Sequence, residues 1–324
     1  MTPQRIDVHQ HVVPPFWAEG LDTHGGDPSG WHSPDWSPGA AIEFMDSLGI
    51  AAGVLSLTAP GVSGWLDADR PHMARRVNEY TADLVRHHPD RFGNFVTLPL
   101  LDIDAALHEV EYGFDTLHAE GVILLSNYEG KYLGDQVFHP LWEELDRRSA
   151  VVFVHPGKPE ITVIDGLPGP MIDYPFDTTR TAVHMAVRGV LDRYPRTRII
   201  LSHGGGFLPY ASHRFAELFS SINPGATSSA SLLNTFQRFY FDTALTSSPA
   251  ALPTLTAFAP PDRILYGSDF PYAAADVGAS FTTKLDDYSL TEGMRSAINH
   301  RNARGLFPRL APAALRPQAA NEMF

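Results

Sequence analysis

The chain has 324 residues, a formal charge of −13 and 44% hydrophobic residues. This composition predicts a globular protein with a packed core, and the negative charge argues against binding to nucleic acid or to an anionic membrane. Because there is no cysteine, disulfides, thiolate metal sites and cysteine nucleophiles are excluded. The first residues lack the apolar stretch of a signal peptide and no membrane-length apolar run follows, so we expect a cytoplasmic protein.

Short apolar or β-branched runs recur along the chain, each followed by loop residues and most by a helix-like pattern. In chain order the runs are 5–12, 51–57, 92–98, 121–126, 150–155, 198–203, 238–244 and 263–269, and the clearest helical patterns are 69–88, 105–120, 139–149 and 177–194. Near-continuous apolar runs favour parallel strands that are buried on both faces and joined by crossover helices. The pattern therefore predicts an α/β fold, a (β/α)8 TIM barrel formed by one domain over residues 1–324; a doubly wound sheet is the alternative.

Two connections are longer than a barrel needs. Residues 14–41, after the first strand, are rich in Gly and Pro and contain Trp17, Trp31 and Trp36, so we interpret them as an ordered lid loop over a pocket. Residues 158–175 follow the fifth strand and are similarly broken by Pro and Gly. Residues 308–324 are rich in Ala and Pro and are predicted to form a frayed or docking tail.

Histidines and one aspartate stand at the ends of the predicted strands. His9 and His11 share one face of the first strand because side chains two residues apart point the same way. His155, His203 and Asp269 end the fifth, sixth and eighth strands. In a barrel the carboxyl ends of the strands converge on one pocket, so four imidazoles and one carboxylate are expected to meet there.

This set of side chains is suited to a metal ion. Imidazole nitrogen and carboxylate oxygen favour Zn, Mn, Fe or Ni over Ca or Mg, and the lack of sulfur ligands favours a catalytic ion with an open position over a structural zinc. The structural alternative is that the histidines cap the barrel by hydrogen bonds to backbone carbonyls. Asp242 on the seventh strand is a candidate partner that would hold a histidine ligand in place.

The same residues carry a resemblance to a known family. An HxH pair on the first strand, histidines on the fifth and sixth and an aspartate on the eighth resemble the amidohydrolase superfamily. Five longer segments are similar to its branch that contains aminocarboxymuconate-semialdehyde, γ-resorcylate and 6-methylsalicylate decarboxylases: NEYTADLVRHHPDRFGNFVTLPL (78–100), FHPLWEELDRRSAVVFVHP (138–156), RIILSHGGGFLPYASHR (198–214), YFDTAL (240–245) and DRILYGSDFPY (262–272). The similarity runs from residue 5 to about residue 307.

The resemblance implies a ligand set of His9, His11, His155 and Asp269 for one divalent ion, Zn²⁺ or Mn²⁺, with His203 assisting proton transfer. One ion is expected because the fourth strand lacks the lysine that bridges two ions in binuclear amidohydrolases. The chain departs from the aminocarboxymuconate enzyme in having no arginine over residues 41–60, which argues against a dicarboxylate substrate. Its HxH motif fits the salicylate-type members better than the resorcylate-type ones.

The function implied is nonoxidative decarboxylation of a small ortho-hydroxy aromatic or related unsaturated carboxylic acid. The ion would chelate the substrate while Asp269 and His203 handle the proton. The main alternative is hydrolysis of a lactone, ester or amide by metal-bound hydroxide, and a noncatalytic barrel that keeps the metal comes third. The family also suggests a homodimer or homotetramer.

Six further residues are candidates for contact with the substrate. The aromatic ones are Trp17, Trp31, Trp36 and Phe176, with packing of the loop against the barrel as the alternative for each. Arg180 and Arg214 are candidates to bind a carboxylate, against the alternative of solvated helix positions. Asp177 is expected to cap the start of a helix.

Overall fold

The computed structural model describes residues 4–24 and 26–310. Seven parallel strands form one curled sheet in the order β1-β2-β3-β4-β7-β8-β9, and β5 and β6 form a separate antiparallel pair. The strands are β1 (Arg5–His11), β2 (Ile50–Ser56), β3 (Phe92–Thr97), β4 (Gly121–Leu125), β5 (Asn127–Tyr128), β6 (Lys131–Tyr132), β7 (Val151–His155), β8 (Arg198–Leu201) and β9 (Tyr240–Phe241). The sheet strands are almost wholly buried, as expected where helices cover the outside.

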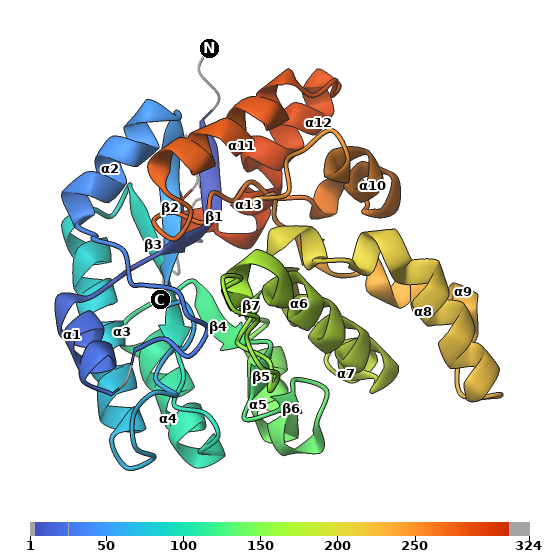
Figure 1. Cartoon of the computed structure of the whole chain (residues 1–324), viewed down its shortest axis with the longest axis horizontal. Coiled ribbons are helices and arrows are strands. Elements are labelled where there is room, and N and C mark those ends of the chain that lie inside the picture. Colours follow the sequence, from blue (N-terminus) through green and yellow to red (C-terminus); the bar gives the residue numbers. More distant parts are fainter. Residues whose placement is uncertain (1–3, 25, 311–324) are drawn as a thin grey trace, which may run out of the picture.

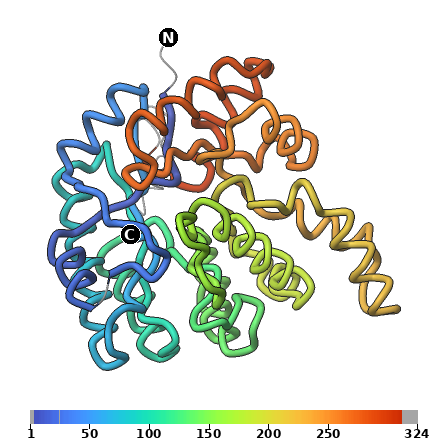
Figure 2. The backbone as a smooth tube through the Cα atoms, in the orientation of Figure 1, coloured from blue at the N-terminus to red at the C-terminus, as the bar shows by residue number. Residues whose placement is uncertain are grey.

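Helices surround the sheet (Figure 1). They are α1 (Pro15–Thr23), α2 (Pro38–Ser47), α3 (Arg70–His87), α4 (Ile103–Asp115), α5 (His139–Arg147), α6 (Gly169–Val187), α7 (Val190–Arg193), α8 (Leu208–Ile222), α9 (Ser229–Phe236), α10 (Ala251–Phe258), α11 (Ala275–Asp287), α12 (Glu292–Ser296) and α13 (Asn302–Leu306). The α8–α9 pair projects outward from the barrel, as the tube in Figure 2 shows. No helix among the described residues is both long and apolar enough to cross a membrane.

The predicted eighth strand, 263–269, closes the barrel but is not a regular strand. The Val8 amide donates to the carbonyl of Tyr266 at 3.0 Å, and the Asp269 amide donates to the carbonyl of His9 at 2.8 Å. On the other side, the Leu265 amide donates to β9. At its end the chain leaves the extended conformation, since the φ of Asp269 is 67°. The TIM-barrel prediction is therefore confirmed, with an irregular eighth segment.

The two long connections are more helical than predicted. Residues 14–41 contain α1 and the start of α2, so they are not one continuous loop. Trp17 on α1 is fully buried against Leu57, Val62 and Trp65, and its indole nitrogen donates to the carbonyl of Gly61 at 2.8 Å. That this segment acts as a lid stays a prediction.

The second connection ends at Gly169, where α6 begins, so the predicted N-cap Asp177 lies inside a helix. That prediction was wrong. Asp177 is fully buried and accepts hydrogen bonds from Ser126, Asn127 and Tyr132, which join α6 to the β5–β6 hairpin. Of the predicted tail, Pro308–Leu310 form a short turn packed under the barrel, and the rest lies outside the described residues.

Candidate metal centre and active site

The strand ends bring five chemically active side chains together. His9 and His11 lie on β1, His155 ends β7, His203 follows β8, and Asp269 ends the irregular eighth segment. Both His203 (φ 53°) and Asp269 (φ 67°) have left-handed backbone conformations, which are uncommon for residues other than glycine. Strain of this kind persists where the surroundings hold it, and it concentrates at functional sites.

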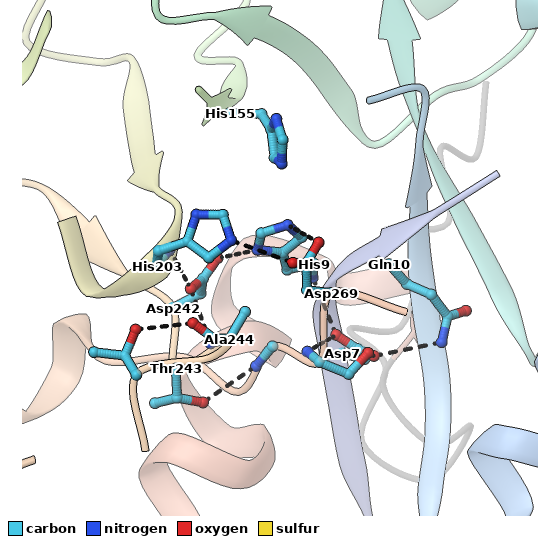
Figure 3. Close-up of polar contacts among 12 residues, drawn as sticks. Asp7, His9, Gln10, His155, His203, Asp242, Thr243, Ala244 and Asp269 are labelled. Carbon is cyan, nitrogen blue, oxygen red and sulfur yellow. Dashed lines mark hydrogen bonds and ion pairs between the residues drawn. The ribbon is translucent and has the colours of Figure 1, made fainter. Parts of the chain in front are cut away.

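Four of these residues form a compact buried cluster. His9, His11, His155 and Asp269 each offer one ligand atom, and these atoms all lie within 4.8 Å of one another. The Asp269 Oδ1 atom lies 3.1 Å from Nε2 of His9 and 3.1 Å from Nε2 of His11. Figure 3 shows the His155 ring pointing toward this group from the opposite side.

The far side of each imidazole in this cluster is held by an oxygen. These contacts are His9 Nδ1 to Asp242 Oδ2 at 2.7 Å, His11 Nδ1 to the carbonyl of Ser56 at 3.2 Å, and His155 Nδ1 to the carbonyl of Pro156 at 2.9 Å. Carbonyl and carboxylate oxygens only accept, so each Nδ1 carries a hydrogen, and Nε2 is the atom whose lone pair can bind a metal ion once that nitrogen carries no proton. Three such nitrogens and one carboxylate oxygen, all within 4.8 Å of one another, fit a divalent cation. The oxygens bonded to Nδ1 are the outer partners that metal-bound histidines typically have.

Charge within the cluster also favours a cation. Burial opposes a charge on His9, but the carboxylates of Asp242 and Asp269 outweigh it and raise the pKa of His9 to about 10. Burial and the neighbouring His11 and His9 lower the pKa of His155 well below its ordinary value. Burial opposes the charged form of Asp269 as well, yet the surrounding histidines hold its pKa well below the usual range. The site thus carries anionic carboxylates beside a His9 proton that a metal ion would replace.

His203 lies at the edge of the cluster, nearer the solvent. Its Nε2 is 3.4 Å from Asp269 Oδ2, and its backbone amide donates to Asp242 Oδ1 at 2.8 Å. The glycines that follow His203 allow the backbone of α6 to lie close to this segment, since a Cβ on Gly206 would lie 2.1 Å from the carbonyl oxygen of Pro175. One carboxylate, Asp242, therefore fixes both His9 and the backbone that presents His203.

The cluster opens into a pocket of about 850 Å³. His155, His203 and Asp269 line its inner end, and most of the remaining lining is apolar. Within the described part of the chain no lysine, arginine or glutamate lines it. The pocket thus offers metal-binding and proton-handling groups at one end and apolar walls elsewhere, which is typical of small-molecule sites.

A family model described as Amidohydrolase matches residues 6–309. The chain belongs to the amidohydrolase family. It is 42% identical to decarboxylase yanB of Aspergillus niger, over 98% of this chain and 91% of that protein. It is 41% identical to the 6-methylsalicylic acid decarboxylase of Penicillium expansum, over 94% of this chain and 97% of that protein.

Solved structures of other amidohydrolases have the same architecture. One, described as an amidohydrolase II, superposes with a TM-score of 0.88 at 32% identity, over 94% of this chain and 99% of its own. Another is a dihydroxybenzoic acid decarboxylase from Polaromonas sp. JS666, with bound manganese and the inhibitor 2-nitroresorcinol. It has a TM-score of 0.78 at 25% identity, over 94% of this chain and 96% of its own.

Most of the predicted substrate contacts of this amidohydrolase do not reach the pocket. Trp31 lines it, whereas Trp17 is buried in a separate apolar cluster and Trp36 packs against the core. Phe176 is exposed and packs on Phe207 with ring centroids 4.4 Å apart. Of the four aromatic residues, only Trp31 therefore lies at the wall of the pocket.

The two arginines predicted to contact the substrate also lie outside the pocket lining. Arg180 is exposed, and its guanidinium lies over the Tyr132 ring at 5.6 Å. Arg214 is exposed on α8, and neither arginine lines the pocket. Both stand on the outward sides of their helices.

Sequence reasoning missed other residues of the amidohydrolase pocket. Thr58, Tyr174 and Tyr272 line it, and the Tyr272 ring lies edge-on to His11 with centroids 5.5 Å apart. Tyr272 stands three residues after Asp269, in the segment DFPY that carried the resemblance, so its position was a usable signal. Tyr174 gave no such signal, because the sequence pattern predicts a helix only from residue 177 and so leaves Tyr174 in a loop.

Proposed function

We propose that this amidohydrolase is a metal-dependent nonoxidative decarboxylase of an ortho-hydroxy aromatic monocarboxylic acid of the salicylate type. The observation that carries the proposal is the contact of Asp269 with His203 at the edge of a four-ligand metal cluster that opens into an apolar pocket. The relatives named as decarboxylases, one of them acting on 6-methylsalicylic acid, support it.

His9, His11, His155 and Asp269 would hold one divalent ion, since their four ligand atoms lie within 4.8 Å of one another. Such an ion supplies Lewis acidity that orients the carboxylate and ortho-hydroxyl of the substrate and stabilises negative charge on its oxygens. Manganese is supported by the Polaromonas structure, and imidazole with carboxylate also suits zinc. A homo-oligomer and a cytoplasmic location stay predictions from the sequence.

The chain's own groups would then manage a proton. During decarboxylation the ring carbon gains a proton, the bond to the carboxylate breaks, and CO₂ leaves while the electron pair stays with the ring. Because the pKa of Asp269 is held low, Asp269 would carry a proton only transiently: His203, whose Nε2 lies 3.4 Å from Asp269 Oδ2, would supply it, and Asp269 would deliver it to the ring carbon. Asp242 keeps His203 in position through its backbone amide.

The pocket walls support one carboxylate on the substrate. No lysine or arginine among the described residues lines the pocket, so a second carboxylate would be buried without a partner. Apolar walls also exclude water around the ring, which strengthens the electrostatic interactions at the inner end.

The test is CO₂ release by manganese- and zinc-loaded protein from salicylate, 6-methylsalicylate and 2,6-dihydroxybenzoate. We expect release from 6-methylsalicylate, and none from metal-stripped protein. Metal-replete protein that releases no CO₂ from any of them, but hydrolyses a lactone, ester or amide, would replace the proposal with the hydrolase alternative.

A further inference from the structure

The pocket has two chemically different ends. The inner end is made by residues at the ends of the strands: His155, His203 and Asp269, with Thr58 and Tyr272 beside them. The outer part is made by helices and carries almost no charge. Its lining includes Met171 on α6, Tyr210 on α8, Ala251 and Leu255 on α10, and Val277 on α11.

The outer part exceeds what a salicylate ring needs. A volume of about 850 Å³ lies near the top of the range of roughly 300–1,000 Å³ typical of sites that enclose drug-sized ligands. One aromatic ring with a carboxylate, a hydroxyl and a methyl group fills only a fraction of it. If the metal cluster fixes the polar groups at the inner end, the remaining volume lies beyond the ring.

The rim of the pocket is apolar and exposed. Met171 is 62% exposed, Tyr210 is 82% exposed and Val277 is 40% exposed, and all three line the pocket. Leu255, farther inside, is fully buried. Apolar side chains gathered at the mouth of a pocket mark a surface that a ligand covers. A flexible apolar chain would cover these side chains on its way out, whereas a polar substituent would find no charged partner.

The outer wall also contains several small residues, which keep this volume open. Ala250, Ala251, Thr254, Ala273 and Ala274 all line the pocket. A larger side chain at Ala251, on α10, would reduce the volume of the apolar region. The volume is therefore a property of this sequence that one substitution can reduce.

We propose that the preferred substrates are salicylates with an apolar alkyl chain of several carbons on the ring, at the position occupied by methyl in 6-methylsalicylate. The chain lies between α6, α8, α10 and α11, and its end reaches the mouth formed by Met171, Tyr210 and Val277. The reaction in this inference rests on the proposed function, whereas the preference for an alkyl chain rests on the pocket alone.

The catalytic test compares kcat/KM for 6-methyl-, 6-propyl- and 6-pentylsalicylate. Burial of each added methylene is expected to raise kcat/KM about fourfold until the outer region is filled. A fall in kcat/KM from methyl to propyl would overturn the inference while leaving decarboxylation of 6-methylsalicylate in place.

A binding test separates the chain from the chemistry. The affinities of 3-methyl-, 3-propyl- and 3-pentylphenol, the products of these substrates, are measured by calorimetry and should rise by the same factor for each methylene, even in protein that releases no CO₂. An affinity that does not change with chain length would overturn the inference.

Paired variants locate the chain. Ala251→Leu, at the start of α10, should lower the pentyl-to-methyl affinity ratio about tenfold or more, because the added carbons occupy the outer region. Ala230→Leu is the matched control, since Ala230 is exposed near the start of α9 and does not line the pocket. A ratio that is unchanged in Ala251→Leu, or that falls equally in the control, would contradict the placement.

Discussion

Replacing Asp242 with asparagine tests the proposed metal centre without changing any ligand. The carboxylate accepts from Nδ1 of His9 at 2.7 Å and, through its other oxygen, from the amides of His203 at 2.8 Å and Ala244 at 3.1 Å. In Asp242→Asn the amide oxygen can keep both backbone bonds, which turns the NH₂ group toward His9. Two donors would then face each other, so His9 has to carry its hydrogen on Nε2, where it blocks the lone pair.

The magnitude follows from this change of tautomer. Loss of a partner that orients a ligand typically lowers metal affinity about 10–100-fold, which is roughly 1.4–2.7 kcal/mol. We expect a change in this range because the other three ligands stay in place. The affinity is measured by competition with a chelating dye for zinc and by electron paramagnetic resonance for manganese.

Asp146→Asn is the matched control. Asp146 on α5 is also largely buried and accepts from the backbone and side chain of Arg196, away from the metal cluster. The Asp146→Asn protein should have a lower free energy of unfolding and an unchanged metal affinity. Asp242→Asn protein that binds the metal within a factor of two of the unmodified protein would refute the assignment of His9 as an Nε2 ligand.

Three further predictions concern proton transfer, backbone and metal. His203→Gln should lower kcat for CO₂ release about 10²–10⁴-fold with the metal content of the protein unchanged, and equal kcat values would remove His203 from the mechanism. Gly206→Ala should lower the free energy of unfolding in urea by more than about 2 kcal/mol, because its Cβ meets the Pro175 carbonyl at φ 63°. Gly225→Ala is the control, because Gly225 has a φ of 87° and no atom within 4 Å of the added Cβ, so it should lose only the free energy of the backbone strain. Equal losses of unfolding free energy in the two variants would contradict the clash at Gly206. Stripping the metal should lower the thermal midpoint and reloading should restore it; about 2.7 kcal/mol is expected at a free metal concentration of roughly 100 times Kd. An unchanged midpoint would show that the ion does not bind the folded state.

The strand ends could be predicted from the sequence because an apolar run marks each strand and a polar residue marks its end. Buried parallel strands read as apolar runs, and polar residues that interrupt such a run at its end, as His155 does, have no packing role to explain them. Asp242 was recognised for the same reason. The geometry of a barrel then brings these ends together whatever the loops do.

The helical contacts could not be predicted because they depend on where a helix begins. With α6 starting at Gly169, the positions that face the pocket are Pro170, Met171, Tyr174 and Pro175, which recur at helical spacing. Phe176 and Arg180, four residues apart, fall on another side of the same helix. Placing the helix start at residue 177 rather than at Gly169 therefore exchanges pocket residues for exposed ones.

The most direct test of the account is the reaction of manganese-loaded protein with 6-methylsalicylate in D₂O. We predict one CO₂ and one 3-methylphenol per substrate, with a single deuterium on the carbon that carried the carboxylate, and loss of this product in Asp269→Asn. Unchanged 6-methylsalicylate in the presence of one bound metal ion per chain, or full activity in Asp269→Asn, would contradict it.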